Sequence, residues 1–296
     1  MDLPNRSAGL LYGFIGVAAF SLTLPATRAA VSAFSPITVT LGRALIAAAL
    51  ALLTLQLAGQ RLPDRRLWAR LAVTSACTVI IFPLLIAWAM SRVEANRGAV
   101  VLGLMPLATA FVGALRGRES PRALFWLAAL TGSAIVVGFT LRDGIGQVKL
   151  ADLALLAAVL AAGVGYAEGG RLARELGGWQ VICWSLAVAV PLLAVAGLLA
   201  LVRLRSAGAA SLAEVPASAW LGLLYLGVVS QLAGFVPWYR GMVLGGVARV
   251  SQLQLLQPFL TIAASALLLG EAITLPAVAA ATAVIITVAV GVWART

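Results

Sequence analysis

The chain has 296 residues, of which 62% are hydrophobic and 10% are charged, and its formal net charge is +11. Typical soluble domains carry roughly 25% charged residues, so this composition excludes an ordinary soluble protein. The absence of histidine from the sequence removes the commonest general base, metal ligand and near-neutral proton carrier.

Apolar runs of about 20 residues recur along the chain, which is the length a helix needs to cross the hydrocarbon core of a bilayer. Charged residues, Gly and Pro separate these runs, and the longest connection is 203–215. The first run lacks a small-residue cleavage site, so we expect a retained helix there and not a signal sequence. The sequence predicts an all-α multi-pass membrane protein with ten helices: Ala8–Ala30, Pro36–Leu57, Trp68–Ser91, Asn96–Leu115, Arg122–Leu141, Leu150–Arg171, Trp179–Val202, Pro216–Met242, Val247–Gly270 and Leu275–Val292.

The basic residues fall mainly in the predicted connections. Thirteen lie on the side of the N-terminus and seven on the other, while Arg43 lies inside the second predicted helix. The positive-inside rule places the richer side in the cytoplasm, so both termini are expected there. Because this rule accounts for the positive charge, no nucleic-acid partner is expected.

Two stretches of the sequence, 97–119 and 249–271, repeat each other at an offset of 152 positions with seven identities. The identities include Pro106 with Pro258 and Glu119 with Glu271. Since each half holds five predicted helices, an odd number, the second copy must enter the membrane from the opposite side. We therefore expect two inverted five-helix repeats, 1–145 and 146–296, around a central cavity. Inverted repeats are a recurring plan for alternating access in transporters, although a duplication can also persist for packing alone.

The second half resembles a known family. Gly222–Thr274 is similar to the repeat of EamA transporters, within the drug/metabolite transporter superfamily, including the Pro-x12-Glu spacing and the ending Leu269–Glu271. The first half resembles the same repeat more loosely, with Gly117-Arg118-Glu119 at its corresponding end. The resemblance implies a multi-pass protein of the bacterial inner membrane that exports small organic solutes. Family members carry varied substrates, and the YddG-like aromatic amino-acid exporters are the branch to test first.

Arg43 is the most informative single residue. It lies about seven positions into its predicted helix, roughly 10 Å from the outer end. A guanidinium at this depth usually faces a bundle interior or a water-filled path. It could bind a substrate carboxylate or phosphate with its planar set of donors, or it could pair with helix carbonyls as a structural element.

Other polar and aromatic residues are candidates to line a substrate cavity. Gln254 and Gln257 share a helix face just before Pro258, and hydrogen bonding between helices is the alternative role for them. Aromatic walls would suit an apolar or aromatic substrate, although packing alone could also explain these side chains. The remaining cavity candidates are Trp88, Tyr166, Trp184, Gln231 and Trp238.

Four prolines lie inside predicted helices and are candidate kinks or gates: Pro25, Pro83, Pro106 and Pro258. Two pairs of glycines, Gly9/Gly13 and Gly241/Gly245, have the small-xxx-small spacing that permits close helix contact.

Acidic residues are scarce at membrane depth. Glu168 is the one plausible proton relay, but Arg171 at i+3 offers it an ion-pair partner, which favours a structural role. Transport driven by the substrate gradient is therefore expected, and the alternative is proton-coupled export of multiple drugs or of other metabolites.

Other functional classes fit less well. No cluster of nucleophile, base or metal ligands is legible, and Cys77 and Cys183 are isolated, so neither catalysis, a metal nor a cofactor is expected. A membrane-embedded enzyme or a channel remains the competitor from another class. The predicted substrate is a small amphipathic metabolite, with an amino acid, aromatic or otherwise apolar, as the first candidate. A functional monomer in the lipid bilayer is expected because one chain supplies both halves.

Overall fold

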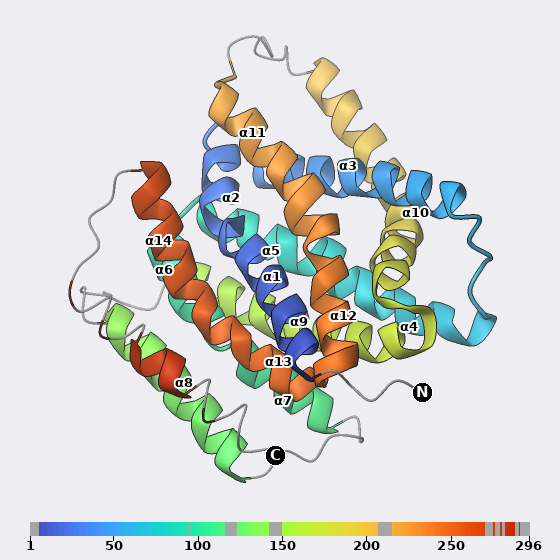
Figure 1. Cartoon of the computed structure of the whole chain (residues 1–296). Helices are drawn as coiled ribbons and strands as arrows, with labels where there is room; N and C mark the ends of the chain where they lie inside the picture. Colours follow the sequence, from blue (N-terminus) through green and yellow to red (C-terminus); the bar gives the residue numbers. More distant parts are fainter. Residues whose placement is uncertain are drawn as a thin grey trace.

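The structure of the protein is a computed structural model that describes residues 6–93, 95–115, 123–141, 150–206, 215–269, 275, 279, 282–287 and 290. These residues form a bundle of helices with no strand among them (Figure 1). The α-helices are α1 (Arg6–Ser21), α2 (Thr23–Val31), α3 (Pro36–Leu57), α4 (Arg65–Ser75), α5 (Phe82–Met90), α6 (Ala95–Leu102), α7 (Met105–Leu115), α8 (Ala123–Leu141), α9 (Leu150–Leu176), α10 (Gly178–Ser206), α11 (Ala217–Tyr225), α12 (Phe235–Gly245), α13 (Val247–Ser251) and α14 (Gln257–Leu269).

Six helical stretches in the described part of the chain are long and apolar enough to cross a membrane. They coincide with the first three predicted helices and with the sixth, seventh and eighth. The fourth, fifth and ninth predicted helices correspond to α6–α7, α8 and α13–α14, and most of the tenth lies outside the described residues. The six stretches support the predicted multi-pass architecture, and the total of ten spans stays a prediction.

Each of the four candidate kink prolines follows an irregular stretch of helix. The helix bends between α1 and α2 before Pro25, is π-helical over Ala76–Ile81 before Pro83, and breaks between α6 and α7 before Pro106. It is 3-10 helical over Gln252–Leu256 before Pro258. A proline inside a helix lacks the N–H that would bond the carbonyl four residues earlier, so it favours such departures.

The same irregularity recurs in the second half at a proline that was not singled out. A π-helical segment, Leu226–Ala233, separates α11 from α12, and Pro237 follows it. This segment corresponds in chain order to Ala76–Ile81 of the first half. The third helix of each half is thus interrupted near its middle.

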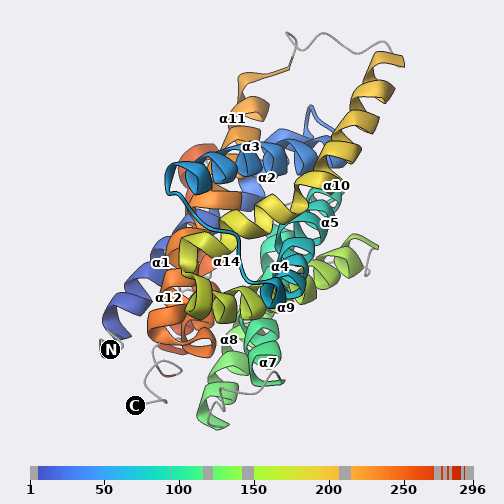
Figure 2. The same cartoon turned by 90° about the vertical axis from the view of Figure 1, so that its right-hand side faces the viewer.

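Helices α1 and α12 approach closely at the two predicted glycine pairs, and they lie side by side in Figures 1 and 2. A Cβ on Gly9 would lie 2.5 Å from the backbone nitrogen of Gly245, and one on Gly241 would lie 2.7 Å from that of Gly13. The structure therefore confirms that the small-xxx-small spacing marks a close helix contact.

Helices of the two sequence halves pack against each other throughout the bundle. Helix α1 contacts α12 and α14, α2 contacts α11, α3 contacts α10, and α7 contacts α9. The main hydrophobic core accordingly draws on both halves, from Val17 to Val284. Buried polar residues at the centre of this core lie between the halves.

Candidate functional site

Arg43 lies in the interior of the bundle with 3% of its surface exposed. Its Nη2 donates a hydrogen bond of 2.9 Å to Oγ of Ser230, in the π-helical segment Leu226–Ala233. Ser230 Oγ in turn lies 2.9 Å from Oγ1 of Thr23 on α2, whose backbone carbonyl accepts a bond from Thr27. The guanidinium therefore joins α3 to the bent first helix through one serine.

The positive charge of Arg43 has no ionic partner among the described residues. The ion pairs of that part of the chain involve Arg66 and Arg70, and Nε of Arg43 has no hydrogen-bond partner there. A buried charge is costly unless it is paired and hydrogen-bonded. The described residues therefore leave the charge of Arg43 without a compensating carboxylate.

Gln231 joins the two π-helical segments across the bundle. Its Nε2 donates a bond of 3.1 Å to the backbone carbonyl of Thr78, which lies in Ala76–Ile81, while its Oε1 has no partner within the described chain. Gln231 is fully buried beside Ser230. The predicted cavity residue thus lies next to the Arg43 contact and retains an unused acceptor.

An aromatic cluster of Phe20, Tyr166, Phe235 and Trp238 lies in the same core. The ring centroids of Tyr166 and Trp238 are 5.7 Å apart, and both rings pack against Phe20. Phe235 packs against Phe20 and Tyr166. Tyr166 is within electrostatic range of Arg43. The structure therefore brings two predicted aromatic candidates together near the buried charge.

The two predicted glutamines of the ninth helix differ in their hydrogen bonding. Gln257 Nε2 donates a bond of 3.4 Å to the Phe20 carbonyl, at the break between α1 and α2. Gln254 is buried, and neither of its side-chain polar atoms has a partner in the described part of the molecule. Gln257 therefore has a structural contact, and Gln254 presents two free polar groups.

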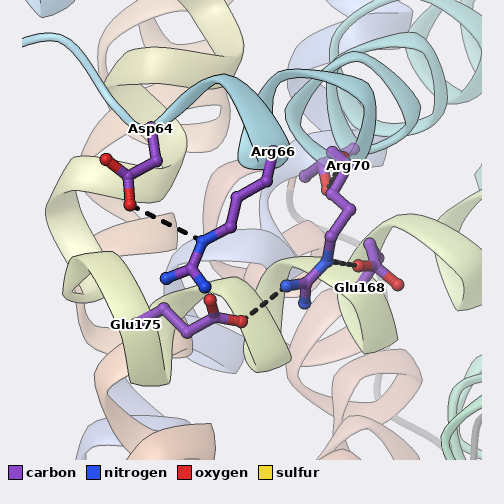
Figure 3. A network of polar contacts seen from close by, with 6 residues as sticks. Asp64, Arg66, Arg70, Glu168 and Glu175 are labelled. Atoms are coloured by element: carbon purple, nitrogen blue, oxygen red, sulfur yellow. Dashed lines mark hydrogen bonds and ion pairs between the residues drawn. The ribbon is translucent and has the colours of Figure 1, made fainter.

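Glu168 is bound by an arginine of another helix. Arg70 of α4 donates from Nε to Glu168 at 2.5 Å and from Nη1 to Glu175 at 2.5 Å, so one guanidinium joins two carboxylates of α9 (Figure 3). Arg171 was expected to be the partner, and the described ion pairs show that this assignment was wrong. The ion pair forms between helices, and not between Glu168 and Arg171 three residues later, because α4 packs along α9 and brings Arg70 to the carboxylate.

Two hollows lie toward opposite ends of α9. The first, which we call the Arg171 cavity, has a volume of about 360 Å³ and is lined by Arg70, Gly113, Ala167, Arg171, Arg174, Glu175 and Val247. The second, the Trp88 groove, measures about 700 Å³ and includes Trp88, Leu84, Leu85 and Ala154. Tyr166 lies along α9 between Ala154 and Arg171. Of the aromatic cluster, Tyr166 therefore lies between the two hollows along α9.

Trp88 and Trp184 do not join the central cluster. Trp88 lines the groove that bears its name, with the Arg92 guanidinium 3.9 Å from its ring centroid. Trp184 is buried against Trp68, at 6.4 Å between ring centroids. A role for Trp184 in a substrate cavity stays a prediction.

Several residues of the site were not found from the sequence: Phe20, Thr23, Thr27, Ser230 and Phe235. Serine and threonine are common in membrane helices, where they bond the backbone of their own turn, so they carry little signal. The one sequence signal for Ser230 is its position next to Gln231, which was a predicted cavity residue.

In the described residues, no group of three or more His, Cys, Asp or Glu side chains is placed to hold a metal ion. The polar groups of the site are suited to binding by hydrogen bonds and charge.

The sequence matches the EamA-like transporter family twice, over residues 7–141 and 149–293. The chain belongs to this family. A curated relative, the "Uncharacterized transporter YdeK" of Bacillus subtilis (strain 168), is 45% identical over 287 residues. The match covers 97% of this chain and 98% of the relative. A solved crystal structure, described only as that of a protein, has a TM-score of 0.76 and 22% identity, over 98% of this chain and 99% of that one. The family resemblance found in the sequence is confirmed, and this EamA-like protein is a transporter.

Proposed function

We propose that this EamA-like protein exports small amphipathic metabolites that bear a carboxylate, with aromatic or other apolar amino acids as the first candidates. The observation that carries the proposal is Arg43, a buried guanidinium with no carboxylate partner among the described residues. A substrate carboxylate would supply the missing negative charge. The aromatic cluster of Tyr166 and Trp238 would contact an apolar side chain.

The proposed mechanism is alternating access between two inverted five-helix halves, 1–145 and 146–296. Three features support it: the sequence repeat at an offset of 152, the two matches to one family, and the interrupted third and fourth helices of each half. Interrupted helices at the interface of repeats are typical of transporter binding sites. The Arg171 cavity and the Trp88 groove would then lie on the two access routes.

Transport driven by the substrate gradient is favoured over proton coupling. Glu168 has a side-chain exposure of 2% and is held by Arg70. In this conformation the guanidinium of Arg70 occupies the Glu168 carboxylate as an ion-pair partner. Proton-coupled export therefore requires this pair to separate during the cycle.

For orientation we propose a multi-pass monomer in the bacterial inner membrane with both termini in the cytoplasm. The excess of Arg and Lys on the N-terminal side supports this orientation. The Arg171 cavity, whose three arginines belong to that side, would then face the cytoplasm.

The test is counterflow of labelled amino acids into proteoliposomes of the purified protein, with and without an imposed pH gradient. Saturable uptake of aromatic amino acids without the gradient is expected. Uptake that requires the pH gradient would contradict transport driven by the substrate gradient alone. Failure of every aromatic and aliphatic amino acid to exchange would contradict the substrate assignment.

A further inference from the structure

The Arg171 cavity has a charge arrangement that the central site does not explain. Arg70, at its edge, is shared between Glu168 and Glu175, so one cation already serves two carboxylates. Arg171 lines the same cavity and forms no ion pair or hydrogen bond with any described residue. The lining carries three guanidinium groups, of Arg70, Arg171 and Arg174, and one carboxylate, of Glu175, so it has an excess of positive charge.

The positions along α9 place Arg171 on a face directed at the cavity. Ala167, Arg171 and Arg174 occur at i, i+4 and i+7, the spacing of one helix face, and all three line the cavity. Small or apolar residues form the opposite walls, with Gly113 from α7 and Val247 from α13. The volume of about 360 Å³ falls within the range of small-molecule pockets.

The cavity and the central site both include residues of α9. Tyr166 is five positions before Arg171, a separation of about 7–8 Å along a helix axis. Tyr166 in turn lies within electrostatic range of Arg43. Arg171 therefore lies about one and a half turns from Tyr166 along α9, on a different face of the helix.

We propose that the Arg171 cavity is a second anion site, which captures the carboxylate of a small organic solute before it reaches Arg43. Arg171 is the residue that we expect to bind the carboxylate most directly. This inference rests on the proposed function for its place in the cycle, while the binding itself is a separate property. Positive charge on the cytoplasmic side alone would predict exposed arginines in loops. It does not predict an arginine that lines a cavity and forms no ion pair with a described residue.

Binding is measured on the purified full chain in nanodiscs of neutral phosphatidylcholine, with 3-phenylpropionate as the carboxylate probe and 3-phenylpropanamide as its neutral counterpart. Isothermal calorimetry on Arg171→Gln, Arg171→Lys and Arg43→Gln compares the two sites. Arg66→Gln is the control, because Arg66 is an exposed arginine at the start of α4 that pairs with Asp64 and does not line the cavity (Figure 3).

The wild type is expected to bind the carboxylate and not the amide. Arg171→Gln should weaken binding roughly ten-fold or more, in line with the loss of a charge-assisted hydrogen bond. Arg171→Lys should retain part of the affinity, and Arg66→Gln should leave it unchanged. Equal binding by wild type and Arg171→Gln, or no binding by the wild type, would overturn the proposal.

A lipid headgroup is the other source of such an anion. Repeating the titration in nanodiscs that contain phosphatidylglycerol distinguishes the sources. An unchanged affinity for the probe supports a site for dissolved solutes, whereas its abolition identifies a headgroup site and overturns the proposal. Arg171-dependent binding without counterflow would refute only the transport function, and counterflow without Arg171-dependent binding would refute only the second site.

Discussion

Thr261 donates a hydrogen bond of 2.6 Å from Oγ1 to the backbone carbonyl of Ser21, which lies 240 residues earlier in the chain. Pro25 lies four residues after Ser21 and has no N–H, so this carbonyl lacks its usual helical donor. Helix α14 thereby stabilises the break between α1 and α2, and Gln257, one turn earlier, bonds the preceding carbonyl of Phe20. The break in the first helix is therefore stabilised by hydrogen bonds from the second half of the sequence.

The Thr261→Val variant should lower the free energy of unfolding by about 1–3 kcal/mol, because it leaves a buried carbonyl unpaired. The loss should shrink in a Pro25→Ala background, where the restored N–H of residue 25 can bond Ser21. Thermal unfolding in detergent measures both. Thr54→Val is the control, since the hydroxyl of this exposed residue bonds a carbonyl of its own helix. Equal losses in the two backgrounds would contradict the account.

The Gly241→Ala variant should destabilise the contact between α1 and α12 by about 1–3 kcal/mol, because its Cβ would lie 2.8 Å from the Gly9 carbonyl oxygen. Gly138→Ala in α8 is the control, since a Cβ there meets no atom within 4 Å. The helix preference of alanine should leave that variant at least as stable as the wild type. Equal melting temperatures for the two variants would show that the close contact is absent.

The Arg70→Gln variant should destabilise the protein more than Glu175→Gln. Removal of Arg70 leaves Glu168, with 2% side-chain exposure, without its guanidinium, whereas Glu175 is 40% exposed. We expect about 1–3 kcal/mol for Arg70→Gln and under ~1 kcal/mol for Glu175→Gln. Chemical unfolding measures the difference, and adding Glu168→Gln to Arg70→Gln should recover part of the loss. A double variant less stable than Arg70→Gln would contradict this.

The Ser230→Ala variant removes the hydrogen-bond acceptor of Arg43 Nη2 and should lower counterflow several-fold, because the guanidinium loses its orientation. Ser32→Ala is a suitable control, since that exposed hydroxyl bonds a carbonyl of its own turn. Wild-type exchange by Ser230→Ala would mean that this serine does not position Arg43.

The sequence predicted the features that depend on composition and short-range pattern. Apolar runs gave the helices within a few residues, and the spacing of Gly9/Gly13 and Gly241/Gly245 marked a real contact. The depth of Arg43 in its helix indicated burial, which the structure shows. Each of these properties is encoded within one helix.

Partners from distant helices could not be predicted in the same way. Arg171 follows Glu168 at i+3, yet the carboxylate is bound by Arg70, because the packing of α4 on α9 is a tertiary property. Ser230 and Thr23 are separated by 207 positions and carry no pattern of their own. Repeat symmetry does help with the interrupted helices, since the break before Pro83 recurs before Pro237.

The most direct measurement of the central claim is counterflow of labelled phenylalanine by wild type, Arg43→Gln, Arg43→Lys and the control Arg66→Gln, all shown to be folded by their melting temperatures. If Arg43 binds the substrate carboxylate, Arg43→Gln should lose roughly ten-fold or more of the exchange rate at subsaturating phenylalanine, Arg43→Lys should lose less, and Arg66→Gln none. Wild-type exchange by folded Arg43→Gln would show that the buried guanidinium is structural and would contradict the proposed site.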